Sequence, residues 1–322
     1  ADRESKLEVT TETIFEAASL SKPVFAYFVM TFVEEGILEL DTPLHQYVEY
    51  PDISYDERYK AITTRMILSH RSGFPNWRDE DGGILKLHFD PGTDYRYSGE
   101  GYMYLALVLK HLLDTDWDGL EKAFQERVAK SLGMKHTRFI QDDYIKNHKA
   151  NPYDSKGNRI NLLEENATTR RYRTSFRAPA SLHSEVIDFS RWMMGIMEGK
   201  GLSKESFQTI LTNHSLVADE SNGVFKIYYT LGFFHPKLFG TNIYMHGGNN
   251  NGFTCWFALD PERKWGYILF TNSEYGEVLG RKLLYFLLVN KTILALYIIA
   301  LFSFVLLLYL VRKNRRHQLK NI

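Results

Sequence analysis

The stretch Ala17-Ala18-Ser19-Leu20-Ser21-Lys22 opens an apolar run that we expect to be helical from about Ser19 to Glu35. Ser19 and Lys22 are three residues apart, a spacing that places both side chains on one helix face within reach of each other. The helix N-terminus adds unpaired N–H groups and a positive dipole end where an alkoxide and then an oxyanion would form. The pair therefore has the arrangement of a nucleophile and its base. Ser-x-x-Lys occurs once in the sequence, but both residues are common, so the pair alone does not establish a function.

Composition bounds the size of the protein and its partners. With 322 residues the chain can bury a large core, as one interleaved unit or as two lobes. Its 39 basic and 39 acidic residues balance, so no global field favours nucleic acid or an acidic partner. Cys255 is the only cysteine, which excludes an internal disulfide and fits either redox compartment. The sequence begins at Ala1 without Met and without an apolar leader, so we expect any targeting segment to lie upstream.

The pattern of apolar residues changes along the chain from helical to strand-like. Helices are predicted over residues 63–68, 102–113, 117–132, 184–197, 203–211 and 278–288. After about Val224, strands are predicted over 225–229, 243–245, 253–259 and 265–271. Residues 142–179 are the least regular and carry eight Lys and Arg residues. They are either a solvated excursion or a cleft wall that receives a substrate carboxylate.

The C-terminal segment has the pattern of a membrane anchor. The twenty residues from Thr292 to Val311 carry no charge, and as a helix they would be about 30 Å long, matching the hydrocarbon core of a bilayer. Arg312, Lys313, Arg315 and Arg316 lie just beyond. The positive-inside rule then predicts a single span with a basic cytoplasmic tail over 312–322 and the preceding domain on the extracytoplasmic side.

Two further motifs carry candidate site residues. Tyr97 lies on a loop before a predicted helix, and its phenol, placed against Lys22, could act as the general base or relay protons to it. His246-Gly247-Gly248 follows an apolar run, and the paired glycines allow a substrate backbone to lie against the strand edge. Asn249 extends this polar rim. Taken singly, a tyrosine near a turn is more often a packing residue, and a lone histidine is more often structural.

Ser19-x-x-Lys22, Tyr97-Ser98-Gly99 and His246-Gly247-Gly248, in this order, resemble the three motifs of the class C β-lactamase and DD-peptidase family. The linking sequence is similar too. ILSHRSGFP at 67–75 resembles the family's LLSHTSGLP loop, and FDPGTDYRYS at 89–98 resembles its approach to the second motif. The resemblance covers roughly Thr11 to Leu288.

The resemblance implies a role for each matching residue. Ser19 would be the acylated nucleophile, and Lys22 and Tyr97 would share proton transfer to and from its oxygen. His246 would be a polar group that faces the carboxylate side of the substrate and Tyr97. The backbone N–H groups of Ser19 and Asn249 would form the oxyanion hole. Gly247, Gly248 and Gly99 would contact the substrate.

The implied fold is an α+β (α/β sandwich) architecture, an antiparallel sheet flanked by helices with an inserted helical lobe at about 60–220, in a domain over 1–290. The sheet would combine residues near the N-terminus with 225–271. Relatives have a helix and strands before the nucleophile, and only eighteen residues precede Ser19, so we expect N-terminal strands to be missing. Gly99 stands where the second motif normally has Asn, which puts efficient β-lactam hydrolysis in doubt.

These observations predict a membrane-anchored serine hydrolase that acts on peptide, amide or ester substrates, with cell-wall D-Ala-D-Ala stem peptides a plausible class. One alternative is an esterase or D-aminopeptidase on the same scaffold. Another is a penicillin-binding receptor or sensor that is acylated without turnover. No cofactor and no metal are predicted, because the eleven histidines show no ligand spacing such as His-Glu-x-x-His.

Overall fold

The computed structural model describes the chain except residues 162–174, 221–224, 239–240 and 319–322. Contacts divide it into two compact units, Ala1–Glu277 and Val278–Ile322. Arg170, Arg171 and Arg173, part of the predicted carboxylate-binding wall, lie outside the described residues.

The first unit contains an antiparallel sheet in the order β3-β4-β5-β7-β8-β9, with the short β6 paired to β5. The strands are β3 (Ser215–Glu220), β4 (Phe225–Tyr229), β5 (Phe234–Leu238), β6 (Thr241–Asn242), β7 (Tyr244–Asn250), β8 (Phe253–Asp260) and β9 (Trp265–Thr271). β7, β8 and β9 form a continuous hairpin series, whereas β5 pairs with β7 only at Phe234↔Met245. β7 is therefore paired with β8 along its whole length on one side. On its other side it pairs with β5 only at Met245.

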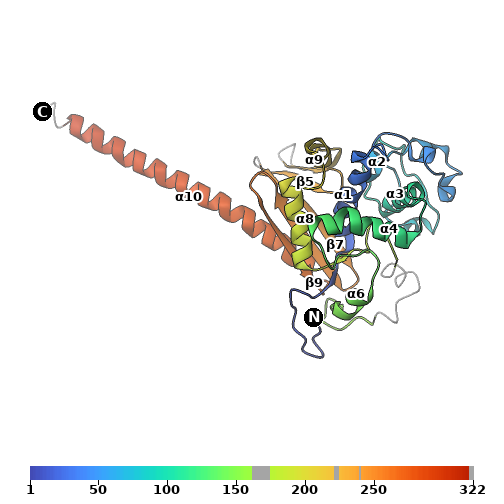
Figure 1. Ribbon diagram of the computed structural model, residues 1–322. Coiled ribbons are helices and arrows are strands. Elements are labelled where there is room, and N and C mark those ends of the chain that lie inside the picture. The colour runs from blue at the N-terminus through green and yellow to red at the C-terminus, as the bar shows by residue number, and fades with distance from the viewer. Residues whose placement is uncertain (162–174, 221–224, 239–240, 319–322) are drawn as a thin grey trace. The chain divides into compact units, whose positions relative to one another are not determined.

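Helices make up most of the regular secondary structure of the first unit outside this sheet, as Figure 1 shows. The α-helices are α1 (Ser21–Glu34), α2 (Thr64–Leu68), α3 (Gly99–Leu112), α4 (Trp117–Phe124), α5 (Lys130–Leu132), α6 (Asp143–His148), α8 (Val186–Glu198) and α9 (Lys204–Leu211). A π-helical turn, η6 (Gln125–Ala129), joins α4 to α5, and 3-10 turns lie at Ala18–Leu20 (η1), Leu44–Gln46 (η2), Pro51–Ile53 (η3), Glu57–Ala61 (η4) and Arg78–Asp81 (η5). The predicted arrangement of an antiparallel sheet flanked by helices is confirmed.

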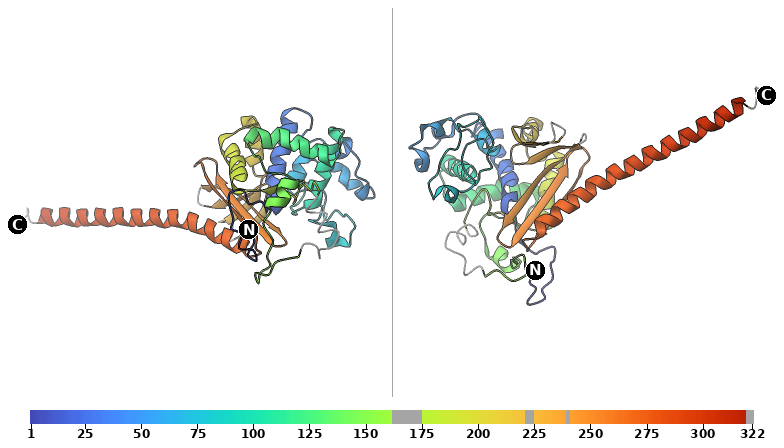
Figure 2. Two further views of the ribbon diagram at one scale, coloured as in Figure 1. Left: turned by 60° about the horizontal axis from the view of Figure 1, so that its bottom comes forward. Right: turned by 180° about the vertical axis from the view of Figure 1, so that it is seen from behind.

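Helix α1 forms the centre of the core. Its residues from Ser21 to Phe32 are all buried, so it is apolar on every side, as expected of a helix enclosed by other elements. Phe25 and Phe28 meet aromatic rings from α3, α4 and the loops beyond, while α8 packs on β8 and β9 on one face of the sheet (Figure 2). The helix that carries Lys22 is thus held from several directions.

Two predictions about the sheet are wrong. Strand β1 (Phe15–Glu16) does not join the large sheet but pairs with β2 (His183–Ser184) in a separate two-stranded sheet. Strands β3 and β5 were not predicted. β3 is half polar, and β5 contains Pro236, which normally argues against a strand.

Helix α10 (Gly276–Gln318) begins at the end of the first unit and accounts for most of the second. Among the described residues, no helix combines the length and the apolar character needed to cross a membrane. The span predicted from Thr292 to Val311 therefore has no support from the structure.

Candidate active site

Ser19 lies in the 3-10 turn η1, immediately before α1. The turn begins with a strained residue, because Ala18 has φ +47°, a left-handed conformation that residues other than glycine rarely adopt. Hydrogen bonds hold the turn on both sides: Ala17 N donates to Leu182 O at 2.8 Å and Ser21 Oγ donates to Ala18 O at 2.5 Å. Ser19 is thereby fixed at the N-terminus of α1.

Strand β7 lies directly against this turn, and Gly248 permits the approach. A Cβ atom at Gly248 would lie 2.7 Å from Ala17 O, 3.0 Å from Ser19 N and 2.6 Å from Cys255 Sγ. Any side chain there would push η1 away from the strand. The sequence singled out Gly248 as a substrate contact, which stays a prediction; its position in the structure sets the distance between Ser19 and the sheet.

Lys22 is fully buried, and its ammonium group faces Ser19. Its Nζ lies 3.3 Å from Ser19 Oγ and 3.1 Å from Pro179 O. Burial lowers the pKa of Lys22 to about 7, because a low-dielectric site disfavours the charged form. Lys22 can therefore be a neutral amine near pH 7 and accept a proton from Ser19.

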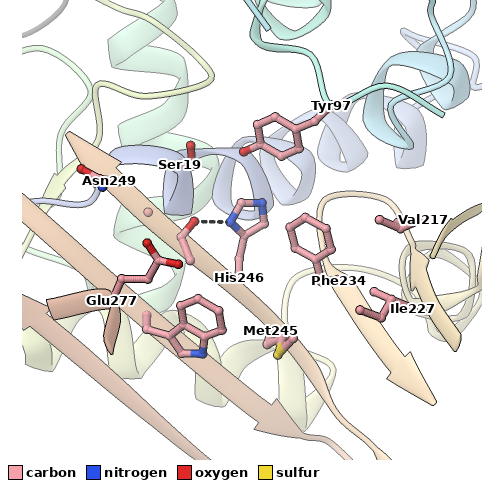
Figure 3. Close-up of a pocket in the computed structure, with 12 residues that line it drawn as sticks. Ser19, Tyr97, Val217, Ile227, Phe234, Met245, His246, Asn249 and Glu277 are labelled. Atoms are coloured by element: carbon pink, nitrogen blue, oxygen red, sulfur yellow. Dashed lines mark hydrogen bonds between the residues drawn. The ribbon is translucent and has the colours of Figure 1, made fainter. Parts of the chain in front are cut away.

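Tyr97 lies over the same pair, and its hydroxyl points toward Ser19 (Figure 3). Lys22 Nζ is 4.4 Å from the centroid of the Tyr97 ring, and burial raises the pKa of the phenol. At neutral pH the hydroxyl is protonated and can hydrogen-bond to the serine oxygen or pass a proton between it and Lys22. The structure thus brings Ser19, Lys22 and Tyr97 together.

His246 lies on β7 beside this group, with its ring centroid 6.1 Å from that of Tyr97. Its side chain is almost completely buried, and both ring nitrogens have partners within the protein. Nδ1 is 2.6 Å from Gly247 O, and Nε2 is 3.1 Å from the Tyr229 hydroxyl. Burial, reinforced by the charge of Lys22, lowers the pKa of His246 to about 3, so the ring is neutral at physiological pH.

The predicted oxyanion donors lie where β7 passes the nucleophile. After Met245, the side of β7 turned away from β8 has no partner strand among the described residues, and η1 contacts both β7 and β8. Asn249 follows Gly248 on this strand, with its side chain exposed. Gly248, the residue before Asn249, lies against Ser19 N, and the role of the Ser19 and Asn249 N–H groups stays a prediction.

A cavity of about 500 Å³ opens beside Ser19 (Figure 3). Apolar side chains make up much of its wall: Val217, Ile227, Phe234, Met245 and Trp256. Its other lining residues are Ser19, Tyr97, His246, Gly247, Gly248, Asn249 and Glu277. Ser19 therefore faces a mainly apolar space that is large enough for a small organic group.

Gly99 does not line this cavity, and the structure leaves no room for a side chain there. A Cβ atom would lie 2.8 Å from Asn76 O and 3.0 Å from the ring of Trp77. Asn76 O also accepts hydrogen bonds from Gly99 N and Glu100 N, which ties the preceding loop to the start of α3. The packing around Gly99 therefore has no space for the asparagine side chain that the second motif normally carries.

Sequence reasoning missed three contributors to the site. Tyr229 bonds to His246, Pro179 O bonds to Lys22, and His70 packs its ring 4.3 Å from that of Tyr97. His70 lies in the loop that resembles the family, which was a usable signal. Pro179 and Tyr229 belong to no motif and reach the site through tertiary structure. Among the described residues, no cluster of three or more His, Cys, Asp or Glu side chains could hold a metal ion.

Comparisons with known proteins agree on one family. The family model described as Beta-lactamase matches residues 1–289. The chain is 22% identical over 294 residues to Protein flp of Staphylococcus aureus (strain MW2), a match that covers 85% of this chain and 56% of the relative. The chain therefore spans about half the length of the curated relatives it matches first.

Solved structures with the same fold include the octameric penicillin-binding protein homologue from Pyrococcus abyssi, with TM-score 0.70 and 22% identity. That match covers 85% of this chain and 65% of the other. The D-alanine carboxypeptidase AmpC from Burkholderia cenocepacia aligns with TM-score 0.66 and 17% identity, over 85% and 83% of the two chains. At these identities the likeness establishes the fold.

Proposed function

The chain belongs to the Beta-lactamase family, and on this premise we propose that it is a serine hydrolase that works through an acyl-enzyme at Ser19. The observation that supports the proposal most directly is the contact of 3.3 Å between Lys22 Nζ and Ser19 Oγ. Burial gives that amine a pKa of about 7, so a base and a nucleophile meet at the end of a helix.

The geometry supports a reaction in two stages. In the first, Ser19 Oγ attacks the carbonyl carbon of the substrate and its proton passes to Lys22, directly or through Tyr97. The oxyanion forms beside the backbone N–H groups of Ser19 and Asn249. The carbon–nitrogen or carbon–oxygen bond then breaks, and the leaving amine or alcohol takes the proton from Lys22. In the second stage, water attacks the carbonyl carbon of the acyl-enzyme and gives a proton to Lys22. The bond to Ser19 Oγ then breaks, and Ser19 Oγ takes that proton back from Lys22.

The substrate class is an amide, a peptide or an ester. D-Ala-D-Ala stem peptides remain a candidate, since one solved protein with this fold is a D-alanine carboxypeptidase. An esterase or D-aminopeptidase is the nearest rival within the same chemistry. A receptor that is acylated without turnover differs only in the second stage.

Acylation and turnover can be tested with a fluorescent penicillin and a chromogenic ester. We expect covalent label or ester turnover in the unmodified protein and neither in Ser19→Ala, because the nucleophile is gone. Ser54→Ala, at an exposed serine, is the matched control and should keep both. Label that persists without turnover favours the receptor. Turnover that survives in Ser19→Ala rejects the nucleophile assignment.

We also propose, from the sequence alone, that the chain is attached to a membrane through the uncharged stretch from Thr292 to Val311. The catalytic domain would then be extracytoplasmic, on the side opposite the basic tail. Alkaline carbonate extraction of membranes containing the full chain tests this. The protein should stay with the membrane, and the double substitution Leu301→Arg, Val305→Arg should release it; release of the unmodified chain rejects the anchor.

A further inference from the structure

The cavity beside Ser19 has a charge distribution that restricts its substrate. Its wall combines the apolar side chains of β3, β4, β5, β7 and β8 with backbone from the Gly247–Gly248 segment. Among the described lining residues there is no Lys or Arg, and the one charged side chain is the carboxylate of Glu277. Figure 3 shows Glu277 on one side of His246 and Phe234, Ile227 and Val217 on the other.

His246 cannot supply the missing positive charge, and hydrogen-bond chemistry shows why. The Gly247 carbonyl oxygen only accepts, so Nδ1, at 2.6 Å from it, must carry the ring proton. A neutral imidazole with its proton on Nδ1 has only a lone pair on Nε2. The Tyr229 hydroxyl, 3.1 Å away, therefore donates to Nε2. Both nitrogens are engaged inside the protein, and the ring offers the cavity its carbon atoms.

Lys22 cannot supply a positive charge to the cavity either. Its amine faces Ser19 Oγ and Pro179 O, and it is not among the residues that line the cavity. A substrate carboxylate in the cavity would lose its hydration and meet an apolar wall, a neutral imidazole and the like charge of Glu277. Removing an ion from water without giving it a partner is strongly unfavourable, whereas removing an apolar group from water is favourable.

We propose that the site takes neutral esters or amides with an apolar group that fills this cavity, and that it discriminates against substrates with a carboxylate there. The inference rests on the proposed function, which it refines: lipophilic neutral acyl compounds are favoured over peptides that end in a free carboxylate. The apolar group packs on Phe234, Met245 and Trp256 while the scissile carbonyl lies at Ser19. The Tyr229–His246–Gly247 chain keeps the histidine neutral and turned inward.

Pairs of nearly isosteric substrates test this directly. The first series varies the leaving group: its members are phenyl butanoates with an isopropyl group or a carboxylate at position 4 of the phenol ring. The second series varies the acyl group: its members are 4-nitrophenyl benzoates with the same two groups at position 4 of the benzoyl ring. We expect kcat/KM to favour the isopropyl compound by roughly 100-fold in at least one series, since an unpaired charge is a strong discriminator. Equal or better turnover of the carboxylate compound in both series overturns the inference.

Adjacent residues of β3 provide a matched pair of variants. Val217 lines the cavity, whereas Leu216 is 47% exposed and does not line it. Val217→Lys places a cation in the wall and should reduce the preference for the isopropyl compound at least tenfold, and Glu277→Gln should reduce it by less. Leu216→Lys should leave it unchanged. If Val217→Lys and Leu216→Lys reduce the preference for the isopropyl compound equally, the cause is a long-range charge effect. That result contradicts the inference that the substrate group lies in this cavity.

Binding separates this inference from the proposed function. The amide analogues of the same pairs are titrated against Ser19→Ala, which cannot be acylated. A retained preference for the isopropyl analogue together with no acylation of the unmodified protein rejects the proposed function alone. Acylation of Ser19 without any preference in binding or turnover rejects the inference alone.

Discussion

The two walls of the cleft use buried ionisable groups in opposite ways. On the wall formed by η1 and α1, the buried Lys22 turns its amine toward Ser19 and has no acidic partner among the described residues. On the wall formed by β7, the buried His246 turns both nitrogens toward protein groups, Gly247 O and Tyr229. Burial lowers the pKa of both side chains, to about 7 and about 3. Only the lysine therefore titrates near neutrality.

This difference gives the two walls separate tasks in the proposed mechanism: one wall holds the proton-transfer groups, and the other contacts the rest of the substrate. In the proposed mechanism, the first wall presents the groups that exchange protons with the substrate's reacting atoms. The second presents carbon surface and a strand edge, and we propose that it orients and selects the substrate. Substitutions on the first wall should therefore lower the rate of acylation with every reagent. Those on the second should change which reagents are accepted, or the stability of the fold.

The largest effect is expected from Lys22→Met, which keeps the length and apolar stem of the side chain but removes the base. Acylation of Ser19 by a neutral activated ester should slow by roughly 10²–10⁴-fold, the usual contribution of a positioned general base. In the unmodified protein the rate should rise with pH through about 7, because Lys22 must lose its proton to act. Stopped-flow release of the leaving group measures both.

The pH profile is the control for that substitution. In Lys22→Met the step near pH 7 should disappear, while in His246→Asn it should remain, since His246 stays neutral throughout that range. A step near pH 7 that persists in Lys22→Met and vanishes in His246→Asn would reverse the assignment of the two walls.

The contact between the walls is tested by Gly248→Ala, for which Gly247→Ala is the matched control. A methyl group at Gly248 would meet the backbone atoms Ala17 O and Ser19 N, whereas at Gly247 it would meet only the ring of Trp256. We expect Gly248→Ala to lower the free energy of unfolding by about 1–3 kcal/mol, as overpacking does, and to slow acylation by displacing Ser19. Urea unfolding and ester turnover measure the two effects.

A side chain can move where a backbone cannot, so Gly247→Ala should cost less stability and leave Ser19 in place. Equal losses of acylation in the two variants would show that the approach of β7 to η1 does not position the nucleophile.

The sequence predicted the first wall better than the second, for a physical reason. Ser19 and Lys22 are neighbours through local helix geometry, which a spacing of three residues encodes. Strands β4 and β9 were predicted with the observed bounds because both are rich in aromatic and β-branched residues. Strand β5 was missed because of Pro236, which the structure accommodates where β5 no longer pairs with β7.

Tyr229 shows where sequence reasoning ends. It reaches His246 only because Tyr229 pairs with Phe234 and Phe234 pairs with Met245, the residue before the histidine. No local pattern encodes two successive cross-strand registers. The same holds for Pro179, whose carbonyl bonds to Lys22 across 157 residues of chain.

Gly99→Asn tests whether the packing around residue 99 can accept the asparagine that the second motif normally carries. The asparagine restores the family's usual residue, but the added side chain would run into Asn76 O and Trp77. We expect no gain in β-lactam turnover and a loss of about 1–3 kcal/mol in the free energy of unfolding. Gly99→Ala separates the steric cost from any gain by the amide. A gain in turnover without loss of stability would show that the loop before α3 can yield.

The smallest effect is expected from Tyr229→Phe, and it probes the neutral state of His246. The change removes only the hydroxyl that donates to Nε2, so stability should fall by about 0.5–1.5 kcal/mol, the net worth of one hydrogen bond. That bond favours the neutral imidazole, so its loss should raise the pKa of His246, which NMR of the ring can follow. Acylation of Ser19 by a small neutral ester should be nearly unchanged, because Lys22 and Tyr97 are untouched. The preference against a carboxylate should weaken at low pH, where the freed nitrogen can be protonated. A loss of acylation as large as that of Lys22→Met would instead place Tyr229 and His246 in the proton-transfer machinery, and the separation between the two walls would not hold.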